Sequence, residues 1–191
     1  MSAQVPGRGH PNHRDWLLVD ASQPGFADGV LEGLGEIFRT TAGRALLRGV
    51  YVSGRCVRIE RHPPTPSPNA SVRPADLQAA TAAGQPTGDS MPDGEPRLGT
   101  GTGSDSLIWF DAVHWPNPTV PAWLTADVLL FALLVEAARH VQGAARPLEF
   151  ANIGAAEAAG DALVQYLQER GVALHAMAAL QALPGVNSTA S

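Results

Sequence analysis

A glutamate and a histidine stand four residues apart near the end of a long apolar stretch, a spacing that could support chemistry. If the stretch is helical, Glu136 and His140 share one face, so the carboxylate could orient the imidazole or both could bind one metal ion. Either group could also transfer a proton. We therefore take Glu136 and His140 as candidate catalytic residues, against the more common alternative of a surface pair.

Two further residues could complete a metal site with this pair. Asp111 follows a predicted strand, and His114 lies in the turn after it. A mixed set of carboxylates and histidines suits zinc or a non-haem metal ion. His114 could equally stack on Trp115, and the sequence does not show that this turn meets the helix. The sequence therefore assigns no metal site and no cofactor.

Other kinds of site are not supported. The chain has no GxSxG motif, and Ser104 and Ser106 have no evident base, which argues against a serine hydrolase. The glycine-rich run 101–106 precedes a strand rather than a helix and lacks the Lys-Ser/Thr pair of a phosphate-binding loop. Cys56 is the only cysteine, which excludes an internal disulfide or a CxxC site.

Charge and hydropathy limit the partners and the location. The formal net charge is -5 and no run of Lys and Arg occurs, so nucleic acid is not an expected partner. The apolar run 128–135 is too short to span a bilayer, so a membrane is not expected either. The first 14 residues contain no apolar stretch like that of a signal peptide. We expect a soluble cytoplasmic protein, or one delivered by a secretion system that needs no signal peptide.

The elements that must position the candidate residues form an α+β pattern. Apolar spacing predicts helices at 26–38, 42–51, 121–142 and 155–170, and strands at 16–19, 56–60 and 106–111. Thr41 is predicted to cap the second helix. The helix at 121–142 is apolar nearly all round, which predicts a buried central helix ending at Gly143. The strands around Val57 and Ile108 are the expected sheet partners.

Composition divides the chain into one domain and less ordered segments. We predict a single α+β domain over residues 15–183, between a disordered leader, 1–14, and a disordered tail, 184–191. Within the domain, residues 62–104 are rich in Pro, Gly, Ser, Thr and Ala and have almost no large apolar side chain. Burial there cannot offset the entropy of ordering the chain, so we predict a flexible insertion.

Four pieces of the sequence occur in the order found in a known family: TAGRALL (41–47), SGRCVRI (53–59), GTGSDSLIWFD (101–111) and the long helix ending at Gly143. This order resembles the NleD-like zinc metallopeptidases, which are bacterial secreted effectors and toxin domains. In that family the helix carries HExxH, whose histidines bind zinc while the glutamate activates water. The resemblance implies a zincin-like α+β fold with a small sheet beside the central helix.

The helix of this chain lacks the histidines of the motif in either of two alignments. Aligning residues 135–139 keeps Glu136 as the catalytic glutamate but places Val135 and Arg139 at the ligand positions. Aligning residues 132–136 makes Glu136 replace the second histidine and removes the catalytic glutamate. The sequence does not choose between them, and both alignments remove the ordinary zinc site.

Two functional hypotheses follow. The preferred one is a catalytically degenerate metallopeptidase-like effector or binding protein, which holds a protein or small-molecule partner in the groove beside the central helix. The other is an enzyme that uses Glu136 as acid/base on a small molecule or peptide. That enzyme could hold a metal ion with His140, His114 and Asp111.

Overall fold

The chain folds as a mixed α+β protein with a small sheet and helices. The computed structural model describes residues 2–4, 15–23, 25–62, 70–90, 94–111, 124–145 and 154–171. Its elements in chain order are β1 (Ser2–Gln4), β2 (Leu17–Asp20), α1 (Phe26–Arg39), α2 (Thr41–Val52), β3 (Val57–Arg61), β4 (Ser71–Pro74), α3 (Leu77–Ala80), β5 (Pro86–Ser90), β6 (Pro96–Leu98), β7 (Ser106–Phe110), α4 (Ala126–Gln142) and α5 (Gly154–Glu169).

The main sheet has five strands in the order β1-β2-β3-β7-β4. Its three central strands, β2, β3 and β7, run parallel, and β1 and β4 pair antiparallel at the two edges. Ile59 pairs with Ile108, which confirms the predicted partnership of these two strands. Both side chains are fully buried, because alternate side chains of each strand point to the face that the helices cover.

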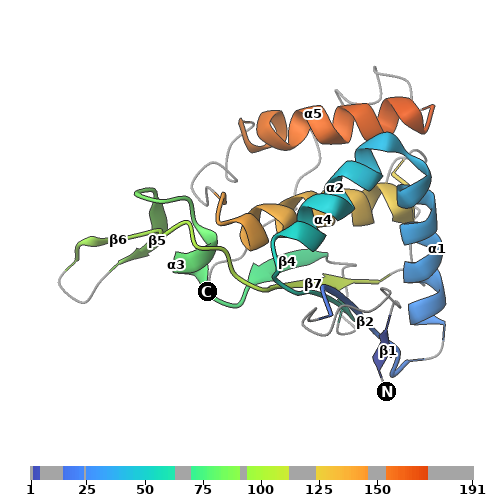
Figure 1. The fold of residues 1–191 in the computed structure, drawn as a ribbon, viewed down its shortest axis with the longest axis horizontal. Helices are drawn as coiled ribbons and strands as arrows, with labels where there is room; N and C mark the ends of the chain where they lie inside the picture. The colour runs from blue at the N-terminus through green and yellow to red at the C-terminus, as the bar shows by residue number, and fades with distance from the viewer. Residues whose placement is uncertain are drawn as a thin grey trace.

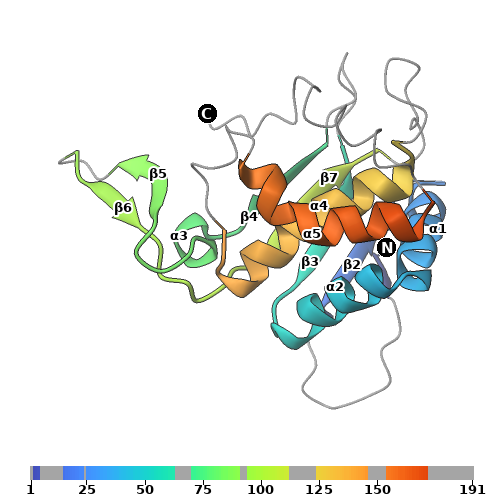
Figure 2. The same ribbon diagram turned by 90° about the horizontal axis from the view of Figure 1, so that it is seen from above.

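Helices cover one face of this sheet in two layers (Figures 1 and 2). α4 contacts β7 and β4 and packs against α1 and α2, while α5 lies over α2 and α4. Leu130, Phe131 and Leu134 of α4 are fully buried, as expected for a helix that is apolar nearly all round. The predicted buried central helix is confirmed, and it ends as predicted at Gly143, which has a left-handed φ of 65°.

Two predicted helix boundaries need correction. α4 begins at Ala126 rather than Pro121, because Leu124 and Thr125 are not helical. The cap of α2 is Thr40 rather than Thr41: the Thr40 hydroxyl accepts a hydrogen bond from the Gly43 amide at 2.9 Å. The capping preference of threonine could not show which of the two adjacent threonines caps the helix.

The last turn of α5 completes the amino-terminal cap of α2. The carboxylate of Glu169 accepts hydrogen bonds from the amides of Thr41 and Ala42, which have no partner within their own helix. A side chain 127 to 128 residues away in sequence therefore supplies what a local capping residue cannot, and it joins the outer layer to α2.

Some regular structure occurs within the segment 62–104, which its composition predicted to be a flexible insertion. β4 completes the main sheet, and β5 and β6 form a separate two-stranded sheet that extends away from the helices (Figures 1 and 2). Backbone hydrogen bonds connect separate parts of this segment: the amides of Gly99, Gly101 and Gly103 donate to the carbonyls of Gln85, Thr81 and Ala79, respectively. The flexibility itself stays a prediction.

The predicted leader and tail fall mostly outside the described residues. Ser2–Gln4 is an exception, because it pairs antiparallel with β2 instead of lacking regular structure. Residues 5–14 and 184–191 are outside the described part of the chain. Within the described part, no helix combines the length and the apolar character needed to cross a membrane.

Candidate functional site

A narrow strip of α4 is left partly uncovered by the packing around it. Ala132, Glu136 and Arg139 are half-buried, whereas nearly all other residues in the second half of the helix are buried. Their spacing of four and then three residues places them on one line along the helix. We call these three residues the α4 strip. Val135, by contrast, is only 6% exposed and belongs to the packed sides of the helix.

Glu136 is the acidic group of the strip. Burial raises the pKa of its carboxyl group to about 7, and the positive charge of Arg139 opposes that rise. Among the residues that the structure describes, none donates a hydrogen bond to this carboxylate. A desolvated carboxyl group is costly to keep charged, so it holds its proton to an unusually high pH.

His140, one turn further along α4, is held in the core. Its Nδ1 atom lies 3.0 Å from the hydroxyl oxygen of Ser106 on β7, and both residues are buried. The Ser106 hydroxyl is also 3.4 Å from the carbonyl of Arg73 on β4. Burial lowers the pKa of His140 to about 4, so the imidazole is neutral at physiological pH. His140 therefore connects α4 to two strands of the sheet.

Burial reverses the usual order of acidity of these two groups. A glutamic acid normally loses its proton at a lower pH than an imidazolium ion. Here Glu136 has a pKa of about 7 and His140 of about 4, so between these values the proton resides on the carboxyl group. Near neutral pH Glu136 can both donate and accept a hydrogen bond, whereas His140 is buried and already engaged.

The structure does not bring Asp111 close to His140. Asp111 follows the far end of β7, where its carboxylate lies 3.8 Å from Nε of Arg61. It lies five positions after Ser106, the contact of His140, and this offset is about 16 Å along an extended strand. His114 lies outside the described residues. Within the described part of the chain, no group of three or more His, Cys, Asp or Glu residues could hold a metal ion.

The glycine-rich run leading into β7 packs against the end of α4 and does not form an anion site. We call residues 99–105 the glycine junction. A Cβ atom on Gly103 would lie 2.3 Å from the carbonyl oxygen of Val141, and one on Gly143 would lie 2.3 Å from that of Gly101. The amides of Gly99, Gly101 and Gly103 donate to protein carbonyls and cannot donate to a phosphate. This geometry agrees with the exclusion of a phosphate-binding loop.

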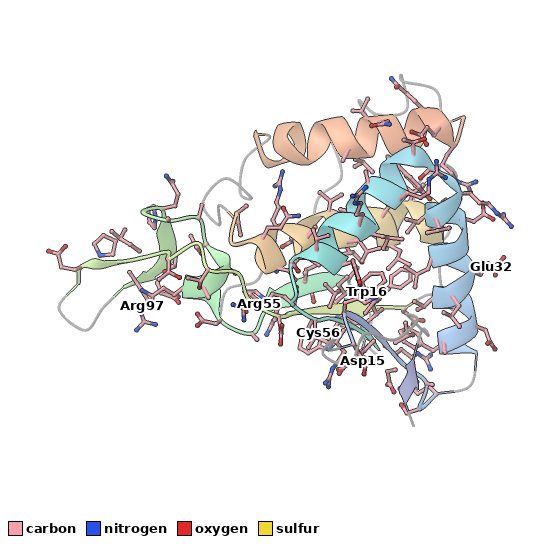
Figure 3. The ribbon with its side chains drawn as sticks, viewed as in Figure 1. Asp15, Trp16, Glu32, Arg55, Cys56 and Arg97 are labelled. Carbon is pink, nitrogen blue, oxygen red and sulfur yellow. The ribbon has the colours of Figure 1, made fainter. Side chains whose placement is uncertain are left out.

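Cys56, labelled in Figure 3, lies just before β3 and is half-buried. Burial raises the pKa of its thiol, and the nearby Asp105 carboxylate raises it further. The thiol is therefore protonated at neutral pH, which is unfavourable for a nucleophile. Its backbone amide donates to the Asp105 carboxylate at 2.9 Å, a contact that ties β3 to the glycine junction.

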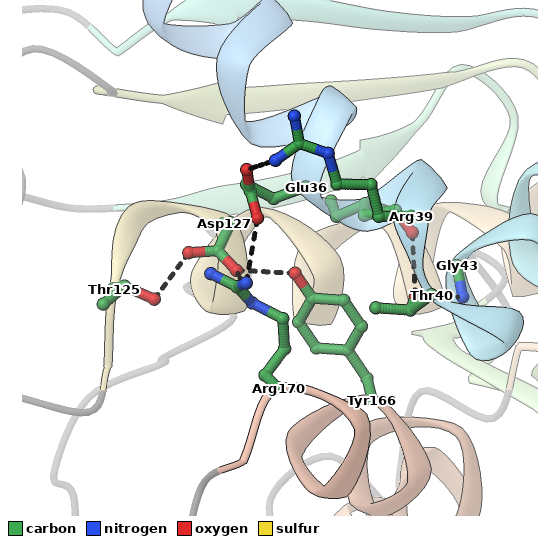
Figure 4. Close-up of polar contacts among 9 residues, drawn as sticks. Glu36, Arg39, Thr40, Gly43, Thr125, Asp127, Tyr166 and Arg170 are labelled. Atoms are coloured by element: carbon green, nitrogen blue, oxygen red, sulfur yellow. Dashed lines mark hydrogen bonds and ion pairs between the residues drawn. The ribbon is translucent and has the colours of Figure 1, made fainter.

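Sequence reasoning missed a polar cluster at the other end of α4 (Figure 4). Asp127 accepts hydrogen bonds of 2.6 Å from the hydroxyl groups of Thr125 and Tyr166. Nε of Arg170 donates to the same carboxylate at 3.0 Å, and Nη1 of Arg170 lies 2.9 Å from the Glu36 carboxylate. The cluster joins α4, α5 and α1. Its only sequence signal is the spacing of Tyr166 and Arg170, which puts both on one face of α5.

The cluster is electrostatically satisfied. Burial raises the pKa of Asp127, but the hydrogen bonds from Thr125 and Tyr166 and the charge of Arg170 outweigh burial, so the net pKa is lowered. Tyr166 also stacks on Phe131, with ring centroids 4.1 Å apart and planes 5° from parallel. Because each group has a partner within the fold, the cluster holds the helices together and offers no free group to a substrate.

Comparisons with known proteins do not add a relative. No protein-family model matches the chain, and no curated protein matches it significantly. The α4 strip and the resemblance of the sequence pattern are therefore the features that bear on function.

Proposed function

We propose that the chain is a non-proteolytic relative of the NleD-like zinc metallopeptidases, which binds a partner through the α4 strip. The supporting observation is the position of two residues, Ala132 and Glu136, on this partly uncovered line of an otherwise buried helix. We also propose that the protein is a bacterial effector that acts in the cytoplasm, and that a secretion system that needs no signal peptide delivers it there.

The accessibility of α4 favours one of the two alignments with HExxH. Two histidines that bind one metal ion must both face the same open side of the helix. Ala132 and Glu136 do so, whereas Val135, a ligand position of the other alignment, is buried. In the favoured alignment Ala132 has no donor atom and Leu133 cannot act as a base, so the residues present do not fit a catalytic zinc ion.

What remains at this position suits a binding site. The carboxyl group of Glu136 is partly desolvated and has no hydrogen-bond donor among the described residues. A partner that supplies a donor would satisfy it, and a buried polar group that gains a partner contributes to affinity. The small side chain of Ala132, one turn away, leaves room for a group of the partner to approach.

Restoring the ligands tests the alignment. We expect the double variant Ala132→His with Glu136→His to bind zinc at least about tenfold more tightly than the wild type, measured by calorimetric titration with zinc chloride. The control is Val135→His with Arg139→His, which should destabilise the fold without gaining zinc affinity. Stoichiometric zinc in the purified wild type, or no gain in the first variant, would refute the proposed relationship.

Crosslinking from the strip tests binding itself. A photoreactive amino acid at position 139 should crosslink a partner in cells, whereas the same group at the exposed position 45 on α2 should not. Adding Glu136→Gln or Glu136→Lys to the photoreactive variant should weaken the crosslink, which would identify the carboxyl group as part of the contact. Equal labelling from both positions, or none from 139, would contradict a binding role for the strip.

The pKa of Glu136 supports a second candidate, an enzyme that uses this group as acid/base. A pKa of about 7 is near the optimum for proton transfer at neutral pH. His140, which is buried and bonded to Ser106, would then keep a structural role and would not touch the substrate. Cleavage of a fluorescent peptide library by the wild type, lost in Glu136→Gln without a change in melting temperature, would replace the binding proposal with this one.

A further inference from the structure

The outer face of α1 carries an apolar stripe that no described residue covers. Phe38 is 61% exposed and Leu31 is 42% exposed, although both are large apolar side chains. Gly35 lies between them on the same side of the helix, and a Cβ atom there would meet nothing within 4 Å. α1 forms one flank of the molecule (Figures 1 and 2), so another helix could approach this face without meeting other described elements.

Charged residues line one side of the stripe, with opposite signs in the two halves of the helix. Asp28 and Glu32 stand in the amino-terminal half and Arg39, which also pairs with Glu36 of its own helix, stands in the last turn, and all three are exposed. Figure 3 shows the Glu32 side chain directed outward from α1. Gly35 lies near the middle of this face of α1. By helical spacing, the three charged residues follow one edge of the face, and Leu31 and Phe38 follow the other edge.

We infer that this face binds a second copy of the chain, so that two α1 helices pack antiparallel about a two-fold axis close to Gly35. The axis places Leu31 of each copy opposite Phe38 of the other. The absence of a side chain on Gly35 lets the two backbones approach closely at the crossing point. This dimer does not depend on the α4 strip.

The charges select the antiparallel arrangement. A two-fold axis perpendicular to both helices keeps the apolar edge against the apolar edge and the charged edge against the charged edge. Because the helices run in opposite directions, Arg39 of one copy then lies beside the acidic half of the other. A parallel pair about an axis along the helices would instead place the charged edge of each copy against the apolar edge of the other, and charged groups brought against apolar side chains are unfavourable.

One helix of 14 residues in each copy makes a small interface, so we expect dimerisation to depend on concentration. Analytical ultracentrifugation of the full chain over a concentration series should show a reversible monomer–dimer equilibrium. Phe38→Ser should weaken the dimer about tenfold or more. The matched control is Val52→Ser, a change at a residue that is 68% exposed at the end of α2, which should leave dimerisation unchanged.

A charge exchange tests the orientation. Glu32→Arg and Arg39→Glu should each weaken self-association, but a mixture of the two variants should form a heterodimer, because each then offers the charges that the other lacks. Circular dichroism of each variant establishes that the helices are intact. A wild type that is monomeric up to the solubility limit overturns the inference. So does equal weakening by Phe38→Ser and Val52→Ser, or a mixture that does not associate.

Discussion

The helical layers and the glycine junction hold the same helix, α4, by different means. On one side α1, α2 and α5 pack large apolar side chains against it, such as Phe131 stacked on Tyr166. At its carboxyl end the glycine junction contacts α4 with almost no side-chain volume. Gly103 approaches the carbonyl of Val141, and the Ser104 amide donates to the carbonyl of His140 at 3.0 Å.

The difference shows two ways of offsetting the entropy of ordering a chain. The helical layers do so by removing apolar surface from water, which leaves a period of three to four residues in the sequence. The glycine junction does so by pairing backbone groups where only glycine permits close approach, which leaves a composition like that of a flexible linker. Substitutions that act on one mechanism but not the other can separate them.

The largest expected effect is loss of a buried side chain on the helical side. Leu134 is fully buried in α4, and Leu134→Ala should lower the free energy of unfolding by roughly 2 to 5 kcal/mol. Chemical denaturation followed by circular dichroism measures this loss. The control, Leu98→Ala, removes the same atoms from a side chain that is 48% exposed on β6 and should cost little. A loss of less than about 1 kcal/mol for Leu134→Ala would mean that α4 is not the anchor of the core.

The glycine junction should be sensitive to a single added methyl group. Gly103 has a φ of +76°, and Gly103→Ala combines an unfavourable backbone conformation with a contact of 2.3 Å to a carbonyl oxygen. We expect a loss of about 2 to 3 kcal/mol. Gly94→Ala is the matched control, because Gly94 has a φ of +86° but open space around it, so it should lose only about 1 kcal/mol. Equal losses would show that close packing at the junction does not matter.

The predictability of the fold follows the same division. The helices and central strands could be predicted because Val57 and Ile59 alternate with polar neighbours, residues 107–110 form a continuous apolar run, and α4 is apolar nearly all round. β5, β6 and the junction could not, because their partners are backbone groups that every residue type carries. Thr40 was not predicted as the cap of α2 because its neighbour Thr41 has the same side chain, and the sequence does not show at which residue the helix begins.

Only the spacing of the candidate residues along the helix could be predicted from the sequence. The sequence placed Glu136 and His140 on one helical face, but it could not show that one reaches a partly open strip while the other enters the core beside Ser106. The exposed fraction of a side chain differs between positions within a single turn of a buried helix, because neighbouring elements cover some positions and not others. The cluster of Asp127 was missed for a related reason, since Tyr166 and Arg170 come from a helix distant in sequence.

A smaller effect is expected at the polar cluster that fastens α5. Tyr166→Phe keeps the stacking on Phe131 but removes the hydroxyl group that donates to Asp127 at 2.6 Å. We expect a loss of about 1.5 to 2 kcal/mol at neutral pH, because the lost bond is to a charged group. The folded-state pKa of Asp127 is lowered, so its contribution is present above the unfolded-state pKa and is lost as pH falls through the folded-state value. Wild type and variant should therefore converge in acid, and a constant gap down to pH 2 would contradict this role.

The smallest expected effect separates the two groups whose acidity is reversed. The folded-state pKa of Glu136 is raised from 4.5 to about 7, so the folded chain keeps a proton that the unfolded chain loses, and stability falls as pH rises between these values. The pKa of His140 is lowered from 6.5 to about 4, so its burial has the opposite effect, and stability falls as pH decreases from 6.5 toward 4.

The two contributions of Glu136 and His140 oppose each other over most of this pH range. Glu136→Gln removes only the first, so the variant should gain stability relative to the wild type as pH rises from 4.5 to about 7 and lose stability more steeply toward acid. Urea denaturation at pH 5, 6, 7 and 8 measures both slopes, with the exposed Glu32→Gln as control. Parallel curves for Glu136→Gln and the wild type would show that the carboxyl group of Glu136 is solvated in the folded protein, and the α4 strip would lose the property on which both functional proposals depend.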